Sequence, residues 1–204
     1  MGNRFAEIAF TPAVQAEQER YGSRNNYLRF LEGEPWNDVL TAKEADFIHA
    51  RDGFYLASVS ETGWPYVQFR GGAPGFLRVL DSKTLAWANF RGNRQYVSTG
   101  NLAGNDRVAL ILMDYANRRR LKVLGTARVR RAGEDDGLAQ RLAVPGYKGE
   151  LESVVEVRVA GFDWNCPQHI TPRFTLDEVE RAVKPLRERV AELEAKLASC
   201  ESAH

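Results

Sequence analysis

The sequence predicts a mainly β (α+β) domain, an antiparallel barrel or sandwich with flanking helices, followed by a C-terminal heptad helix. Short segments with the alternation of strands recur between Phe54 and Val159. Helix-start signals precede them, and a seam of apolar residues follows them. Because 204 residues bury one sizeable core but are short for two ordinary domains, we expect one domain with extensions at its ends.

Helix signals dominate the N-terminal part of the chain. Thr11 precedes a proline, which is a typical first helical residue, and the polar stretch up to Arg20 fits a surface helix. Thr41 and Glu44 have the spacing of a capping box and open a short amphipathic helix. We therefore expect residues 1–45 to form a helical extension.

Alternating apolar and polar residues mark the strands of the sheet. They are expected at Phe54 to Ser60, Tyr66 to Arg70, Phe76 to Leu80, Thr84 to Asn89, Val108 to Met113, Leu121 to Arg130 and Val154 to Val159. The turn Glu61-Thr62-Gly63 joins the first two strands as a hairpin. Helices are expected at Asn93 to Leu102 and at Gly137 to Ala143, where Pro145-Gly146 ends the second.

The C-terminal residues 175–204 carry a heptad seam that a capping box from Thr175 to Glu178 opens. The apolar residues alternate in steps of three and four: Leu176, Val179, Val183, Leu186, Val190, Leu193 and Leu197. This pattern favours a coiled or a docked helix. Pro185 lies inside the seam, so one kinked helix and two helices are equally compatible with the sequence.

Charge and composition restrict the classes of function. Lys and Arg number 28 against 27 Asp and Glu, which gives a net charge of +1 and argues against nucleic acid or an anionic membrane as a partner. No apolar run is long enough to span a bilayer, and the first residues do not resemble a signal peptide. Two cysteines and three histidines show no metal-ligand spacing. We expect a cytoplasmic, metal-free protein.

The strongest candidate for a binding site is the segment Asn89-Phe90-Arg91-Gly92-Asn93-Arg94-Gln95. A strand is expected to end there and a helix to begin. Backbone amides at a helix start favour a phosphate, and glycine permits a close approach. Arg91 and Arg94 would add charge-assisted hydrogen bonds. A tight turn with solvated arginines is the competing interpretation.

Gln68 and Arg70 alternate on one strand and therefore share one face of the sheet. They could contact one ligand together, and Gly71-Gly72 just beyond them would allow its close approach. The alternation of these two residues is equally compatible with a strand whose polar side faces solvent.

Other reactive side chains lack partners in the sequence. Cys166 and His169 lie three residues apart, but no third member of a nucleophilic triad accompanies them. The basic run Arg118 to Lys122 is expected to form a solvated hairpin end. Several carboxylates are expected in solvated turns: Asp114, Glu134, Asp135 and Asp136.

Three segments together resemble the pyridoxamine 5'-phosphate oxidase-like family of FMN-binding proteins. They are Gly63 to Gly72, Trp87 to Gln95 and Asn105 to Leu110, and the resemblance covers about Asp46 to Val159. It implies a split β-barrel over residues 46–162 with FMN as cofactor. It also implies a homodimer that holds two FMN sites at the subunit interface, each lined by both subunits.

The resemblance also assigns residues to the cofactor. The strand along the flavin corresponds to Val67, Gln68, Phe69 and Arg70. The turn that binds the ribityl phosphate corresponds to Asn89, Phe90, Arg91, Asn93, Arg94 and Gln95. Relatives bring a later strand to the cofactor as well, which makes Lys122 or Arg120 a further candidate contact.

The end of the chain departs from the true pyridoxamine phosphate oxidases. These enzymes end in a segment with a tryptophan and an arginine-X-histidine pattern, whereas this chain has a linker at 163–174 and the heptad helix. We therefore do not expect vitamin B6 oxidation. Two hypotheses stay open: a flavin-dependent oxidoreductase acting on a small molecule, with NAD(P)H as a candidate donor, and a non-catalytic flavin, deazaflavin or haem binding protein. Trp64 or Trp164 could form a substrate wall, or could belong to the core.

Overall fold

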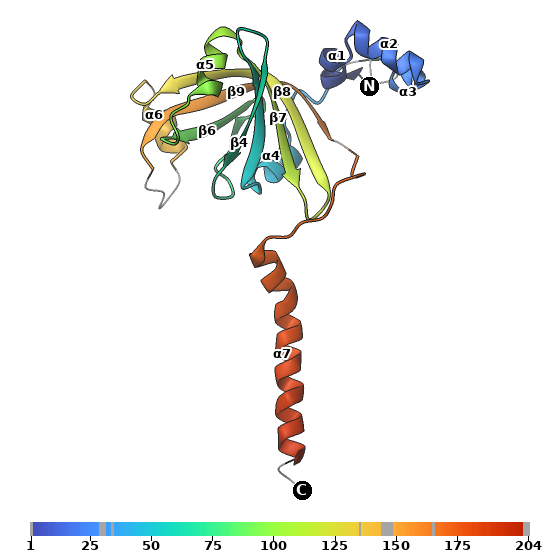
Figure 1. Ribbon diagram of the computed structural model, residues 1–204, viewed down its shortest axis with the longest axis vertical. Coiled ribbons are helices and arrows are strands. Elements are labelled where there is room, and N and C mark those ends of the chain that lie inside the picture. The colour runs from blue at the N-terminus through green and yellow to red at the C-terminus, as the bar shows by residue number, and fades with distance from the viewer. Residues whose placement is uncertain are drawn as a thin grey trace. The chain divides into compact units, whose positions relative to one another are not determined.

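The structure is a computed structural model that describes residues 2–28, 32–33, 35–134, 136–143, 149–164 and 166–201 (Figure 1). The chain divides into two compact units. The first comprises Met1–Asp114 and Arg119–Pro167, and the second comprises Tyr115–Arg118 and Gln168–His204. The first unit contains the sheet and the candidate site.

An antiparallel sheet dominates the first unit. Among the described residues it has seven strands: β3 (Gly53–Val59), β4 (Pro65–Gly71), β5 (Arg78–Asp81), β6 (Thr84–Phe90), β7 (Arg107–Asp114), β8 (Arg119–Arg131) and β9 (Leu151–Trp164). Their order is β4-β3-β7-β8-β9-β6-β5. All seven strands correspond to predicted ones, although the third starts at Arg78 instead of Phe76.

The two longest strands curl the sheet into an open barrel (Figure 1). β8 pairs with β7 along one edge and with β9 along the other, and β9 continues into pairing with β6. The β8–β9 register shifts between Leu124 and Gly125, which marks a β-bulge that bends the ladder. The hairpin between β3 and β4 turns at Gly63, whose φ of 85° suits glycine.

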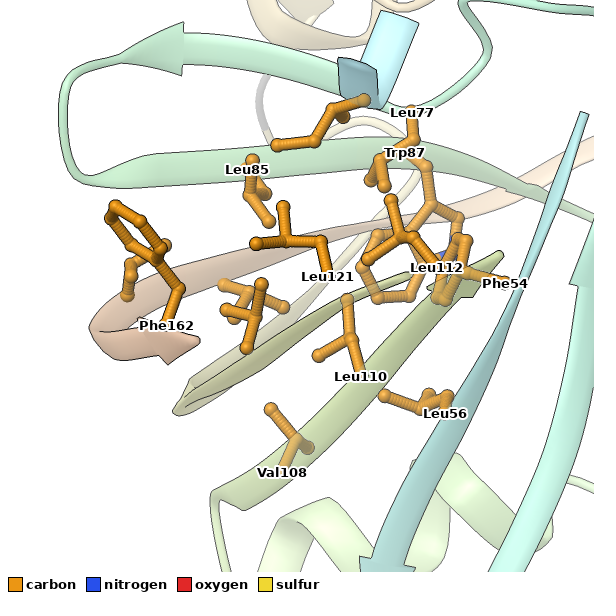
Figure 2. Packing of buried hydrophobic residues seen from close by; sticks show 14 of the residues in the cluster. Phe54, Leu56, Leu77, Leu85, Trp87, Val108, Leu110, Leu112, Leu121 and Phe162 are labelled. Atoms are coloured by element: carbon orange, nitrogen blue, oxygen red, sulfur yellow. The ribbon is translucent and has the colours of Figure 1, made fainter. Parts of the chain in front are cut away.

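The interior of the barrel holds the main hydrophobic core (Figure 2). Phe54 and Leu56 of β3 pair with Leu112 and Leu110 of β7, and all four side chains are at most 1% exposed. Trp87 of β6 packs edge-on against the Phe54 ring with 5.1 Å between ring centroids. Burial of side chains of this size stabilises the fold by about 1.5–3 kcal/mol each.

Short helices flank the sheet. They are α1 (Arg4–Ala9), α2 (Pro12–Arg20), α3 (Arg24–Leu28), α4 (Ala42–His49), α5 (Val97–Gly104) and α6 (Asp136–Arg141). The two predicted N-terminal helices are present: Thr11 caps α2, and the Glu44 carboxylate accepts the backbone N–H of Thr41 at 3.1 Å at the start of α4. The predicted helix end at Pro145-Gly146 lies outside the described residues.

The N-terminal extension is fastened to β9. Asn3 caps α1 by accepting the Ala6 amide at 2.8 Å, and Asn37 Nδ2 donates to the Asn3 side chain at 3.1 Å. The backbone of Phe162 in β9 donates to Asn37 O at 2.7 Å. Two short parallel strands, β1 (Gly2–Asn3) and β2 (Pro35–Trp36), join the ends of the extension. Neither these strands nor α1 and α3 could be recognised in the sequence.

The second unit consists mainly of one helix, α7 (Leu176–Glu201). It runs through Pro185 without a break, which resolves the choice between one helix and two in favour of one. The predicted capping box is present, since Thr175 and Glu178 exchange hydrogen bonds of 2.8 to 3.2 Å. In the part of the chain that the structure describes, no helix is both long and apolar enough to cross a membrane.

Gly125 provides a test of the bulge. A Cβ atom at this position would lie 2.4 Å from the Arg158 carbonyl oxygen and 2.9 Å from Val157. We expect Gly125→Ala to lower the free energy of unfolding by about 1–3 kcal/mol in urea titrations, because the backbone of β9 cannot move aside. Gly100→Ala is the control, since a Cβ there meets nothing within 4 Å. A loss no larger than that of the control would contradict tight packing at the bulge.

Candidate functional site

A chain of hydrogen bonds connects strands that are far apart in the sheet order. Arg70 Nη1 of β4 donates to Asn89 Oδ1 of β6 at 2.8 Å. Asn89 Nδ2 donates in turn to Ser153 Oγ of β9 at 3.0 Å. β4 is the edge strand opposite to β5 and β6, so these contacts cross the gap where the barrel is open.

Arg70 carries an unmet hydrogen-bond donor at this crossing. Its Nε is buried and, among the described residues, contacts no acceptor. Burial lowers the pKa of the Arg70 guanidinium, although arginine stays charged at neutral pH. A buried positive charge with a free donor is costly unless an anion or another acceptor satisfies it. The position is therefore suited to an anionic group.

The segment after β6 does not form the start of a helix as predicted. The β6–β9 register shifts between Asn89 and Phe90, and α5 begins at Val97 rather than Asn93. Arg94 and Tyr96 have φ of 60° and 52°, a left-handed conformation that no α-helix accommodates. Residues 91–96 instead form an irregular loop that precedes the helix.

The first turn of α5 is nevertheless fixed beside this loop. Ser98 Oγ donates to Gln68 Oε1 of β4 at 2.9 Å, and Asn101 Nδ2 donates to Ser58 Oγ of β3 at 3.0 Å. The first hydrogen bond back along the helix is made by the Gly100 amide to Tyr96 O at 2.8 Å. The amides of residues 97–99 precede that bond and belong to the positive end of the helix.

Two adjacent cavities of about 220 and 260 Å³ surround these groups. Arg70, Asn89, Phe90 and Gly92 line both. The smaller one is polar and also includes Gln68, Asn93, Arg94, Gln95 and the first turn of α5. The larger one continues past Phe69 and Arg91 towards Phe76 and Trp87. Most of the residues predicted to bind a phosphate therefore meet at one place.

The two loop arginines differ in their surroundings. Arg91 forms an ion pair with Glu150 and has its Nε 3.9 Å from Glu152, and the hydrogen bond and charge of Glu150 raise the pKa of Arg91. Arg94 lines the polar cavity, and a hydrogen bond with Tyr96 raises its pKa. Glu150 and Glu152 act on the charges of both arginines, but among the described residues only Arg91 forms ion pairs with them. Arg94 is therefore the better candidate for contact with an anion.

Comparison with known proteins identifies the family. The model of the pyridoxamine 5'-phosphate oxidase family matches residues 40–160, which is more than half of the chain. The chain belongs to the pyridoxamine 5'-phosphate oxidase family. No curated protein sequence matches it.

Three solved structures are similar to this chain, and the first of them, with a TM-score above 0.5, supports the fold. HupZ from Group A Streptococcus is 18% identical with a TM-score of 0.51, over 66% of this chain and 99% of that protein. A putative pyridoxamine 5'-phosphate oxidase from Lactobacillus delbrueckii is 24% identical with a TM-score of 0.47, over 62% and 94%. An FMN-binding protein from Syntrophomonas wolfei is 15% identical with a TM-score of 0.44, over 72% and 97%. The open barrel is the predicted split barrel.

Some residues that the family resemblance suggests lie away from the cavities. Val67 faces the other side of β4, is 61% exposed and lines neither cavity. Phe69 on the same side is 58% exposed but does border the larger cavity. Lys122 lines neither cavity. Its Nζ pairs with Asp163 at 2.8 Å and lies 4.7 Å from the centre of the Phe5 ring. The structure therefore does not bring Lys122 to the candidate site within one chain.

The glycines near the site have roles other than the expected ones. A Cβ at Gly72 would lie 2.6 Å from the Phe76 ring, and one at Gly71 would lie 2.9 Å from Phe69. These glycines make room for aromatic rings of the chain itself rather than for a ligand. At Gly92, which lines both cavities, a Cβ would meet nothing within 4 Å.

Several residues that line the polar cavity were not predicted from the sequence. Tyr66, Tyr96, Ser98, Thr99 and Glu152 all line the polar cavity. Tyr96 OH donates to Glu152 Oε1 at 2.8 Å, which fixes the loop to β9. The period-two rule applied to Gln68 and Arg70 could have added Tyr66, whereas the others depend on how the loop folds.

Several other side chains that the sequence singled out lie outside the candidate site. Asp114 is 5% exposed and pairs with Arg51 at 3.5 Å, so it does not lie in a solvated turn. Arg119 of the basic run stacks 4.9 Å from the Trp164 ring, and that tryptophan donates to Glu44 at 2.7 Å. Trp164 is thus a packing residue rather than a substrate wall. Cys166 is exposed and Asp135 lies outside the described residues.

Asn89 can be tested as the centre of the hydrogen-bond chain. Asn89→Ala leaves both Arg70 Nη1 and Ser153 Oγ without their partner. We expect it to lower the free energy of unfolding by about 1–3 kcal/mol in urea titrations. Asn93→Ala removes an exposed amide from the loop that follows β6 and breaks only exposed hydrogen bonds with Gln95, so it is expected to have little effect. Equal effects of the two substitutions would contradict a structural role for the Asn89 amide.

Proposed function

We propose that this chain binds FMN, with the ribityl phosphate in the polar cavity between β4, β6 and α5. The Nε atom of Arg70 is the observation that supports this most strongly, because it is a buried cationic donor without an acceptor among the described residues, on a side chain that lines the polar cavity. Arg94 and the amides at the start of α5 add further positive groups. Membership of the family supports FMN over other anions.

The cavities are too small to hold a whole cofactor, which indicates that one chain forms only part of the binding site. Each is smaller than the roughly 300–1,000 Å³ of a typical small-molecule site, so each would hold only part of the cofactor. The outer side of β4 and its neighbours exposes Val67, Phe69, Tyr55 and Ile111. We propose that a second subunit covers this apolar side and completes two FMN sites at the interface.

Bound FMN would supply the redox chemistry, by accepting and releasing a hydride or electrons. The chain positions the cofactor: Arg70 and Arg94 would neutralise the phosphate, and Gln68 and Asn89 offer amide groups along β4 and β6. Arg91 would stabilise the loop through its ion pairs with Glu150 and Glu152. We propose a flavin-dependent oxidoreductase acting on a small molecule, with a non-catalytic flavin, deazaflavin or haem binding protein as the alternative.

Arg94 gives the sharpest test of the phosphate site. We expect Arg94→Ala to weaken FMN binding on the order of tenfold, because a charge-assisted hydrogen bond to the phosphate is lost. Riboflavin has no phosphate, so its affinity is expected to stay unchanged in the variant. Both affinities can be measured by flavin fluorescence titration. Arg91→Ala is expected to weaken FMN binding less.

Arg107→Ala is the matched control, because Arg107 is an exposed arginine of β7 that lines none of the cavities near Arg70. It is expected to bind FMN like the unchanged chain. Equal losses for FMN and riboflavin in Arg94→Ala would contradict a phosphate contact, as would an unchanged affinity for FMN.

Anaerobic titration with NADH and NADPH tests the enzymatic part of the proposal. We expect the absorbance of the bound flavin near 450 nm to bleach with one of these donors, at a rate proportional to the protein concentration. A protein that binds FMN tightly and is bleached by neither donor, yet is bleached by dithionite, would favour the non-catalytic alternative.

A further inference from the structure

The apolar seam of α7 lies open to solvent. Leu186 is 66% exposed, Val190 is 52% exposed and Leu193 is 48% exposed. Val183 is half-buried, and the seam also includes the exposed Leu176, Val179 and Leu197. Such a continuous apolar stripe on a helix is a surface that another helix can cover.

The helix itself needs a partner. Pro185 lies in its interior, removes one backbone hydrogen bond and costs an isolated helix about 3 kcal/mol. Most of the stability of helices in proteins comes from packing of their apolar face rather than from intrinsic propensity. Pro185 occupies the heptad position two residues after Val183, on the side away from the seam. The proline therefore leaves the seam itself regular.

We propose that α7 forms a parallel, two-stranded coiled coil with α7 of a second copy of this chain. The seam residues occupy the two core positions of the heptad, called a and d. The a positions are Leu176, Val183, Val190 and Leu197, and the d positions are Val179, Leu186, Leu193 and Cys200. In the two central heptads, valine stands at a and leucine at d. This combination favours parallel two-stranded coiled coils.

Charges beside the seam favour the same orientation. Two further positions flank the core: g, the residue just before a, and e, the residue just after d. In a parallel pair, a g residue faces the e residue of the next heptad on the partner. Arg189 would then face the partner's Glu194, an attractive pair on both sides of the coil. In an antiparallel pair with full overlap, Arg189 would face the partner's Arg189, and Glu180 would face the partner's Glu194. Both of these contacts are repulsive.

Arg189 and Lys196 already contact Glu192 of their own helix at 2.6 Å. Glu192 lies two residues after Val190, outside the core positions, so neither of these contacts crosses the seam. Each basic group retains further N–H donors for a carboxylate on the partner. The intrahelical pairs are thus compatible with the interhelical ones.

Cys200 offers a direct test, because a d residue faces its own copy across a parallel, in-register coil. In the full chain with Cys166→Ser, copper-phenanthroline and oxygen would join two Cys200 thiols, which lose two protons and two electrons to oxygen. We expect covalent dimers on non-reducing gels, reversed by reductant. In an antiparallel coil the two thiols would be about 36 Å apart, since 24 residues separate the ends of the seam.

Ala195→Cys in a chain with Cys166→Ser and Cys200→Ser is the matched control, because position 195 lies on the outer side of the coil. We expect Cys200 to cross-link on the order of tenfold faster than this control, since pairing raises the effective concentration of only the facing thiols. Equal rates would mean that the helices are close but unpaired, and would overturn the proposal. Absence of a Cys200 cross-link would do the same.

Two further sets of variants test whether a parallel α7 of a second copy, rather than another partner, covers the seam. Leu186→Gln is expected to slow the Cys200 cross-link, whereas Glu188→Gln on the outer side is expected to leave it unchanged. Arg189→Glu is expected to slow it through repulsion with the partner's Glu194, and adding Glu194→Arg is expected to restore it. Failure of that restoration, or insensitivity to Leu186→Gln, would show that something other than a parallel second copy covers the seam.

Discussion

The contact of Arg70 with Asn89, continued to Ser153, is the constraint on which the rest of the first unit depends. It joins an edge strand to strands at the opposite side of an open sheet, where no backbone ladder connects them. The same contact uses only part of the guanidinium and leaves Nε buried and unmet. The contact across the open side of the barrel and the donor left for an anion thus belong to one side chain. Removal of Arg70 would affect both, which is why the phosphate assignment is better examined at Arg94.

The neighbouring elements hold this arrangement in place. α5 is tied to β4 through Ser98 and Gln68 and to β3 through Asn101 and Ser58, so its positive end stays beside Arg70. The loop before it is held by Tyr96 and Glu152. Left-handed residues in that loop delay the helix until Val97 and place Arg94 at the cavity. Because these groups are fixed before a ligand binds, little ordering of the protein would be needed on binding.

The sequence allowed the strands, the two capped N-terminal helices and α7 to be predicted, because each depends on local periodicity or capping. Gln68 and Arg70 could be placed on one face for the same reason. The start of α5 could not, since the left-handed conformations of Arg94 and Tyr96 follow from contacts with β9 that have no local signal. Asp114 was wrongly expected in solvent because its partner, Arg51, is distant in sequence. Arg119 is exposed as expected, but its contact with the Trp164 ring had no local signal. Long-range contacts of this kind decide which charged residues remain available to a ligand.

A crystal structure of the full chain with FMN tests the central claim most directly. The account predicts the phosphate within hydrogen-bonding distance of Arg70 Nε, beside Arg94 and the first-turn amides of α5, with the rest of the cofactor extending beyond the cavity towards a second subunit. A wider depression of about 1350 Å³, lined by residues of β8 and β9 such as Arg128 and Arg158, is another place that could take an anion. A phosphate bound there, or FMN bound with Arg70 Nε still unmet, would contradict the account.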